Sequence, residues 1–383
     1  MANRFILNET SYFGAGAREN IAVEIKGRGF KKALVVTDKD LIKFGVAGKV
    51  FEVLDNAGIA YEVYDEVKAN PTVKNVQAGV EKFKSAGADV IVAIGGGSAI
   101  DTAKGIGIIV ANPEFSDVVS LEGTADTKNK AVPIIAAATT AGTAAEVTIN
   151  YVITDEATKH KMVCVDPHDI PVVAIVDSEL MSSMPRGLTA ATGMDALTHA
   201  IEGYITKGAW EMSDMFHIKA IEMIGKSLPD AVENKPEGRE AMALAQYVAG
   251  MGFSNVGLGI VHSMAHPLGA WYDTPHGVAN AVLLPYVMEY NAPATGTKYR
   301  DIAAAMGVKG TENMSEDEYR KAAVDAVKAL SKKVGIPEKL HEVGVKEEDL
   351  PALAKDAFND VCTGGNPKDT SIEEILEIYK TAF

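Results

Sequence analysis

The sequence predicts an α/β domain with a parallel sheet followed by an all-α domain. Its 383 residues correspond to about two domains of ordinary size. The first 180 residues alternate short apolar runs with helical patterns, which is typical of a parallel sheet covered by helices on both faces. From about Leu180 the strand signals stop and only helical patterns follow. We therefore expect two domains, residues 1–180 and residues 181–383.

The hydrophobic period predicts each element in turn. Five runs are apolar and rich in β-branched residues, as expected for strands buried on both faces, and they span 31–37, 60–64, 89–94, 132–137 and 172–176. Between the first of these, residues 40–56 and 73–86 place apolar side chains on one helical face. In the second domain, the helical period predicts helices over 189–206, 212–234, 239–254, 278–290, 316–334 and 372–381.

Composition excludes several classes of protein. Asp and Glu number 52 and Lys and Arg number 37, so the net charge is −15. A nucleic-acid binder, or a docking patch for anionic lipid, needs a basic surface instead. Hydrophobic residues make up 47% of the chain, which is enough for a sizeable core and rules out global disorder.

No segment predicts membrane insertion or secretion. No apolar run approaches the ~20 residues that a membrane helix needs. The N-terminus carries only a short apolar stretch, Phe5-Ile6-Leu7, which does not make a signal peptide. Cys164 and Cys362 are interpreted as free thiols in a reducing compartment. We therefore expect a cytoplasmic protein with no membrane or nucleic-acid partner.

Two segments of small residues follow predicted strands and can cradle phosphate. In the first, Gly95-Gly96-Gly97-Ser98, glycines let the backbone approach an anion at the N-terminus of a helix. A tight turn capped by Ser98 is the alternative interpretation. The dinucleotide pattern G-x-G-x-x-G is not met, since Ile100 occupies the third glycine position. The second segment, residues 139–143, offers hydroxyl groups to a ribose or phosphate.

Asp38 ends the first predicted strand. An acid at this place can bind the ribose hydroxyls of a dinucleotide and repel a 2′-phosphate, which selects NAD over NADP. The alternative is an acid that stabilises the N-terminus of the next helix.

Four histidines and an aspartate cluster in two short stretches of the helical half. Asp195 and His199 are spaced i, i+4, as are His262 and His266, and His276 follows after a Pro-Leu-Gly break. Two helical pairs and a loop histidine can converge on one Zn²⁺ or Fe²⁺ ion. Each pair alone is more often a cap or surface feature, but both lie in apolar, Gly- and Ala-rich segments, where unpaired polar groups are costly to bury. The remaining histidines, interpreted as structural, are His160, His168, His217 and His341.

Two spacings join these residues: Asp177-x7-Pro185-x9-Asp195-x3-His199-x2-Glu202 and His262-x3-His266-x9-His276-Gly277. Together with GGGS-x2-D-x2-K at 95–104 and TTAGTAAE at 139–146, they resemble the iron-containing (group III) alcohol dehydrogenase family. The resemblance runs over essentially the full length. It implies an α/β N-terminal nucleotide-binding domain with a parallel sheet, plus an all-α C-terminal metal-binding domain.

The resemblance also implies the site residues. The implied metal ligands are Asp195, His199, His262 and His276. The implied cofactor contacts are Asp38, Asn70, Gly96, Gly97, Ser98, Thr139, Thr140, Thr143, Thr148, Asn150 and Lys161. A small substrate pocket would be lined by Phe253, Leu258 and Cys362.

The implied chemistry is NAD-dependent hydride transfer between a small aldehyde and an alcohol, best suited to a three-carbon diol or hydroxyaldehyde. The metal, Fe²⁺ with Zn²⁺ also possible, acts as Lewis acid. His266 lies near the ligands but is not one of them, so it is the expected proton relay. We also expect a homodimer, because an early strand at 5–9 leaves an edge to which a second subunit can pair.

Three alternatives stay open at this point. The first is an enzyme of the dehydroquinate synthase or glycerol-1-phosphate dehydrogenase kind, although the metal-ligand stretches lack the Arg/Lys cluster that holds a phosphorylated substrate. The second is a zinc glycerol dehydrogenase or another short-chain alcohol dehydrogenase of the same fold. The third is a non-catalytic metal-binding protein, which the intact glycine turns and ligand pattern disfavour.

Overall fold

The computed structural model describes residues 2–158 and 160–383 and divides the chain into two compact units, Met1–Met184 and Pro185–Phe383. The boundary falls four residues after the predicted one at 180, because the short helix α6 (Ser178–Met181) belongs to the first unit. Its N-cap, Asp177, is fully buried and accepts hydrogen bonds from the backbone N–H groups of Gly16 and Arg18. These bonds tie the start of α6 to the N-terminal segment of the first unit.

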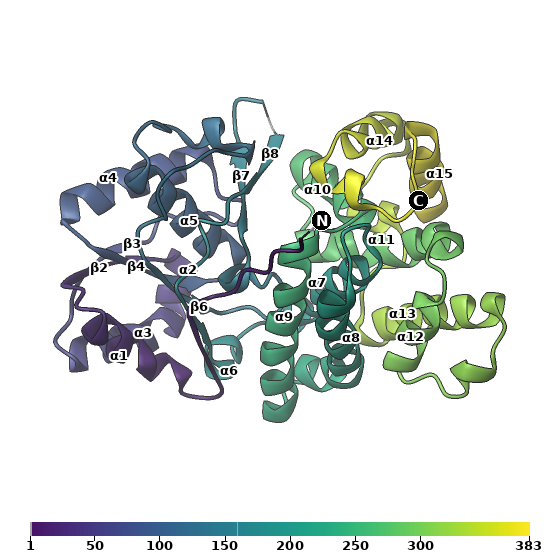
Figure 1. The fold of residues 1–383 in the computed structure, drawn as a ribbon, viewed down its shortest axis with the longest axis horizontal. Helices are drawn as coiled ribbons and strands as arrows, with labels where there is room; N and C mark the ends of the chain where they lie inside the picture. The colour runs from purple at the N-terminus through teal and green to yellow at the C-terminus, as the bar shows by residue number, and fades with distance from the viewer. Residues whose placement is uncertain (1, 159) are drawn as a thin grey trace. The chain divides into compact units, whose positions relative to one another are not determined.

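A six-stranded parallel sheet forms the centre of the first unit, in the order β1-β9-β6-β4-β2-β3 (Figure 1). Its strands are β1 (Thr10–Phe13), β2 (Lys32–Val36), β3 (Ala60–Tyr64), β4 (Val90–Gly95), β6 (Ile134–Ala138) and β9 (Val173–Val176). The predicted fold class is confirmed, and five strands lie where the apolar runs predicted them. The early strand is the correction: it begins at Thr10, not within 5–9, and it pairs with β9 at the edge of the sheet.

Helices cover both faces of this sheet (Figure 1). On one face α1 (Asn20–Gly27) and α3 (Val46–Asn56) share a buried apolar cluster with alternate residues of the strands. On the other face lie α4 (Val73–Ala86) and α5 (Gly97–Ala111). The single helix predicted over 40–56 is broken into α2 (Lys39–Lys43) and α3, because Gly45 has φ +75, a left-handed conformation that glycine adopts without strain.

A second, three-stranded sheet was not predicted. It consists of β5 (Gly123–Thr124), β8 (His160–Val165) and β7 (Asn150–Asp155), with β7 and β8 antiparallel. Both hairpin strands alternate buried with less buried residues, so neither reads as a continuous apolar run.

The described part of the second unit contains only helices, as predicted. The α-helices are α7 (Arg186–Ile205), α8 (Glu211–Val232), α9 (Pro236–Val256), α10 (Ile260–Tyr272), α11 (His276–Asn291), α12 (Lys298–Ala305), α13 (Glu316–Val334), α14 (Leu350–Phe358) and α15 (Ile372–Ala382). Helix α10 does not break after His266 as expected. It continues through Pro267 to Tyr272, because its buried packing outweighs the local cost of an internal proline.

In the described ranges 2–158 and 160–383, no single helix is long and apolar enough to cross a membrane. One pair of helices, α9 and α10, passes on length and composition when joined, but it is bent by 103° at the break.

His217 on α8 is buried in the second unit against two glycines. A Cβ atom at Gly203 on α7 or at Gly252 on α9 would lie 2.3 Å from its Nε2 atom, so glycine is what lets the ring fit. Neither ring nitrogen has a hydrogen-bond partner among the described residues. Burial therefore lowers the pKa of His217 to about 3. The structural interpretation of this histidine agrees with its position.

This burial predicts acid sensitivity. The folded-state pKa of His217 is below its ordinary value of 6.5, so protons bind preferentially to the unfolded chain. The contribution of the neutral His217 to the unfolding free energy is complete above pH 6.5 and is lost as the pH falls toward 3, by on the order of 5 kcal/mol in total. We expect His217→Leu to reduce the loss of unfolding free energy between pH 7 and pH 4.5, measured by urea titration of chelator-treated protein. Equal losses in variant and wild type would contradict this assignment.

Candidate active site

Several of the predicted cofactor residues of the first unit lie at the carboxyl ends of adjacent strands. Strand β4 pairs with β2 on one side and with β6 on the other. Asp38, Gly96 and Thr139 therefore follow three neighbouring strands. The chain runs from β2 to β3 on one side of the sheet and to β4 on the other, so this is a topological switch point, where open α/β sheets bind ligands.

The glycine turn after β4 fits close against the segment after β6. A Cβ atom at Gly96 would lie 3.0 Å from the side chain of Thr140, and one at Gly97 would lie 3.2 Å from Thr143. The hydroxyl of Thr140 is buried and has no partner among the described residues. Helix α5 begins at Gly97, so its unpaired backbone N–H groups face this turn. These features fit a phosphate group.

The structure corrects the alternative role of Ser98. It lies inside the first turn of α5 and not at the N-cap, which is Gly96. Its hydroxyl donates to the carbonyl of Ala69 at 2.6 Å, which brings the adjacent Asn70 beside the glycine turn.

Asp38 is the N-cap of α2 and accepts a hydrogen bond from the backbone N–H of Leu41 at 2.8 Å. The helix-stabilising role is therefore present. The hydrogen bond from Leu41 uses Oδ1 of Asp38. A contact between this carboxylate and a cofactor stays a prediction.

Buried Lys104 on α5 supports two other predicted cofactor residues. Its ammonium group donates to the carbonyls of Thr148 and Asn150 at 2.6 and 2.8 Å, and it lies 3.6 Å from the buried Asp169. The Thr148 hydroxyl faces Lys104, so this side chain points into the core of the unit. Lys161 on β8 lies opposite Thr154 in the hairpin.

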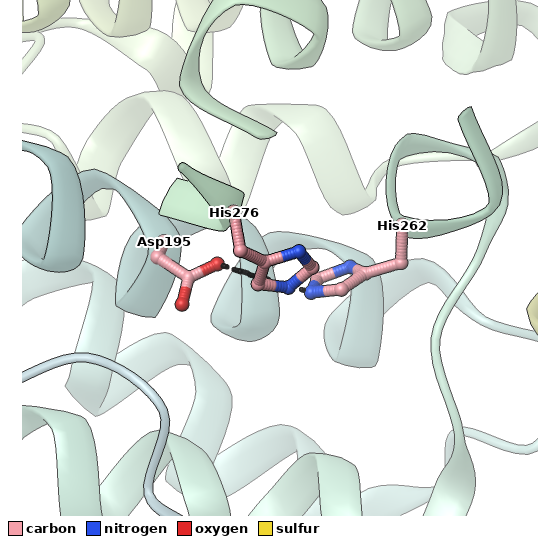
Figure 2. A group of neighbouring side chains, drawn as sticks. All are labelled: Asp195, His262 and His276. Atoms are coloured by element: carbon pink, nitrogen blue, oxygen red, sulfur yellow. Dashed lines mark ion pairs between the residues drawn. The ribbon is translucent and has the colours of Figure 1, made fainter. Parts of the chain in front are cut away.

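In the second unit, three of the predicted metal ligands converge (Figure 2). Asp195 comes from α7, His262 from α10 and His276 from the first turn of α11. One ligand atom from each lies within 4.8 Å of the other two. Asp195 Oδ1 is 4.0 Å from His262 Nε2 and 3.8 Å from His276 Nε2.

The amide nitrogen of Asn280 marks the point on which these atoms converge. It lies 2.7 Å from Asp195 Oδ1, 3.2 Å from His262 Nε2 and 3.1 Å from His276 Nε2. An NH₂ group has two hydrogens and cannot satisfy three acceptors together, while Asn280 Oδ1 is buried without a partner among the described residues. A carboxylate and two imidazoles around one point are a donor set for Fe²⁺ or Zn²⁺. The residues present therefore fit a divalent cation.

His199, the fourth predicted ligand, lies beside this group and does not belong to it at the 4.8 Å limit. Its ring packs between Phe253, at 4.2 Å, and His262, at 4.5 Å between centroids. This places the predicted pocket residue Phe253 one ring away from the candidate ligands.

A buried carboxylate holds the other nitrogen of His262. Glu202 Oε2 lies 2.5 Å from His262 Nδ1, and Glu202 Oε1 accepts from the backbone N–H of Val261 at 2.7 Å. Burial lowers the pKa of His262 well below its usual range. His262 is therefore uncharged, as a metal ligand must be.

His266 has an equivalent partner in Asp360. Its Nδ1 atom lies 2.7 Å from Asp360 Oδ2, and its ring stacks on His276 with the centroids 5.4 Å apart. Burial would raise the pKa of Asp360, but the His266 imidazole and the backbone N–H of Cys362 outweigh it and hold the pKa at about 2. The carboxylate is thus ionised.

The two remaining pocket residues lie on segments that meet near this dyad. Cys362 belongs to the 3₁₀ helix η8 (Val361–Gly365), and burial raises the pKa of its thiol. Leu258 precedes α10. The Thr206 hydroxyl lies 3.1 Å from the Leu258 carbonyl and 2.8 Å from the Gly365 carbonyl, so one donor joins the two segments.

Sequence reasoning assigned no role to three residues of this region, although Glu202 is part of the spacing that resembles the family. Glu202 follows His199 by three positions, and Asn280 follows His276 by four, so helical spacing alone could have found both. Asp360 gives no such signal, because it lies 94 positions from His266.

Two family models match the chain. The model for iron-containing alcohol dehydrogenases covers residues 8–178, and the C-terminal model of the same family covers residues 189–383. The chain therefore belongs to the iron-containing alcohol dehydrogenase family. It is an alcohol dehydrogenase-like oxidoreductase, and its class of reaction is the metal-dependent interconversion of alcohols and aldehydes.

Individual relatives are similar over the whole length. Lactaldehyde reductase of Escherichia coli strain K12 is 61% identical over 383 residues, covering 100% of both chains. NAD-dependent methanol dehydrogenase of Bacillus methanolicus is 42% identical over 99% of each chain. The crystal structure of a 1,3-propanediol oxidoreductase superposes with a TM-score of 0.97, at 42% identity and with 100% of both chains covered.

Proposed function

We propose that this protein is an NAD(H)-dependent metal alcohol dehydrogenase for a small aldehyde and its alcohol, with lactaldehyde and 1,2-propanediol as the favoured pair. The convergence of Asp195, His262 and His276 on one point carries the proposal. The choice of substrate is supported by the similarity to lactaldehyde reductase. The choice of cofactor is supported by the switch-point position of the glycine turn and by the NAD-dependent relative.

Asp195, His199, His262 and His276 would hold the cation, Fe²⁺ or Zn²⁺. When bound, the cation supplies Lewis-acid polarisation of the substrate oxygen, and NADH supplies the hydride. Asp195 would contribute the negative charge of the set, and the histidines would contribute uncharged nitrogens. Phe253, which stacks on His199, would shield one side of this group from water.

His266 is the group that would move the proton. Its Nδ1 atom faces the ionised Asp360, so Nε2 remains to give a proton to the nascent alcohol or to take one from it. Leu258 and Cys362 would limit the pocket to short substrates. We further propose a cytoplasmic homodimer, with β1 as the strand available at the edge of the sheet.

A substrate panel tests the function. Full-length protein is stripped with chelator, reloaded anaerobically with Fe²⁺ or with Zn²⁺, and mixed with NADH and aldehydes of two to six carbons, with and without a 2-hydroxyl. We expect NADH oxidation to be fastest with the three-carbon hydroxyaldehyde and to require metal. Turnover that is equal in stripped protein, or absent with every aldehyde, would overturn the proposal.

The cofactor preference rests on Asp38. Its carboxylate would face the 2′-phosphate of NADP(H), so we expect wild-type protein to prefer NAD(H). Asp38→Gly should relax that preference by roughly tenfold, about 1.4 kcal/mol of like-charge repulsion. The measurement is kcat/KM for both cofactors. Asp38→Asn, which keeps a helix N-cap and removes only the charge, should relax the preference as Asp38→Gly does. A wild type that uses both cofactors equally would refute this placement of Asp38.

A further inference from the structure

Helix α10 carries two histidines one turn apart, and each has its Nδ1 atom on a carboxylate from another segment, fully buried for His262 and partly buried for His266. Glu202 of α7 meets His262 at 2.5 Å, and Asp360, from the connection after α14, meets His266 at 2.7 Å. The resemblance stated from the sequence assigns no role to either of these contacts.

Glu202 is built into its place. Its side chain is 1% exposed, and its Oε1 atom accepts from the backbone N–H of Val261. Gly259 packs directly against the same oxygen, since a Cβ atom at this position would lie 2.9 Å from Glu202 Oε1. The carboxylate cannot move away from His262 without losing these contacts, so it restrains the ring on its Nδ1 side.

Asp360 is held in a similar way by a different set of groups. The backbone N–H of Cys362 donates to Oδ1 at 2.8 Å, and the Ser263 hydroxyl lies 3.3 Å from the same atom. The Thr363 hydroxyl lies 2.8 Å from the Ser263 hydroxyl. Oδ2 is thereby directed at His266.

We propose that Glu202 and Asp360 are positioning residues that assign different tasks to the two histidines of α10. A carboxylate that accepts Nδ1–H leaves the Nε2 lone pair as the one reactive position of the imidazole. Glu202 directs this lone pair of His262 to the metal position, where Asp195 and His276 converge. Asp360 directs that of His266 toward the substrate oxygen. The second half of the proposal rests on the proposed function, whereas the first half does not.

The two tasks are separable by two isosteric substitutions. Glu202→Gln should lower the affinity for Zn²⁺ by about 10–100-fold, the usual effect of removing an outer partner of a metal-bound histidine. Asp360→Asn should leave that affinity unchanged and lower kcat by about 10–100-fold with little change in KM. Affinity is measured by competition with a chromogenic chelator. Co²⁺-loaded Glu202→Gln should show a shifted visible spectrum, and Co²⁺-loaded Asp360→Asn the wild-type spectrum.

The surface variant Glu377→Gln is the matched control, because the Glu377 side chain is 70% exposed and forms an ion pair with Lys380. Circular dichroism checks folding. If Glu202→Gln does not fold, Glu202→Asp replaces it, since the shorter side chain keeps the charge and withdraws it from Nδ1. Unchanged Zn²⁺ affinity on altering Glu202, lost affinity in Asp360→Asn, or unchanged kcat in Asp360→Asn overturns the division of tasks. Failure of the wild type in the substrate panel would overturn the proposed function and leave the metal measurement intact.

Discussion

His262→Ala and Asp195→Ala are each expected to empty the metal site and abolish turnover while the fold survives. Each substitution removes one of three ligand atoms that lie within 4.8 Å of one another. The loss of metal affinity should exceed the roughly 10–100-fold effect of altering an outer partner. Metal content after dialysis is measured by elemental analysis, together with NADH oxidation and the circular dichroism spectrum.

His341→Ala is the matched control for these variants. It removes a histidine of the same unit whose Nδ1 atom lies 2.5 Å from the terminal Phe383 carbonyl, away from the ligand group. It should bind metal and turn over like the wild type. Full metal occupancy in both His262→Ala and Asp195→Ala would refute the ligand assignment.

His266→Ala is expected to keep its metal and its affinity for NADH while the chemical step slows by roughly 10²–10⁴, the usual contribution of a positioned acid or base. Single-turnover kinetics with pre-bound NADH measure that step directly. Added imidazole should restore part of the rate, because the substitution leaves space where the ring stacked on His276.

The result for His266→Ala separates three roles. Lost metal would identify His266 as a ligand. A raised KM for NADH with an unchanged chemical step would identify a packing role. Only a slowed step with metal and cofactor affinity retained supports the proton relay, and an unchanged kcat refutes it.

The sequence predicts those features that its local period encodes. Strands β2, β4 and β9 are buried on both faces, so each appears as an apolar run. The β7–β8 hairpin alternates its exposure and gives no such signal. Helix α10 was predicted as a broken segment, because Pro267 ends most helices, and only the packing around its buried face reveals that it continues.

The candidate site also contains residues that local spacing predicts and residues that it does not. Spacing along one helix relates Asp195 to His199 and predicts a metal centre. The partners of the histidines on α10 are distant in sequence: Glu202 is 60 positions from His262, and Asp360 is 94 from His266. Such pairs follow from tertiary packing alone, so a single sequence cannot predict them.

The division of the chain has a consequence for how a bound metal stabilises the protein. All four proposed ligands belong to the unit Pro185–Phe383, and every proposed cofactor contact belongs to Met1–Met184. By mass action, a metal at 100 times its dissociation constant adds about 2.7 kcal/mol to the free energy of unfolding of the unit that contains its ligands. The metal therefore stabilises the helical unit, and the dinucleotide stabilises the unit Met1–Met184. In calorimetry, metal should therefore raise the unfolding temperature of the helical unit, and dinucleotide that of the other unit.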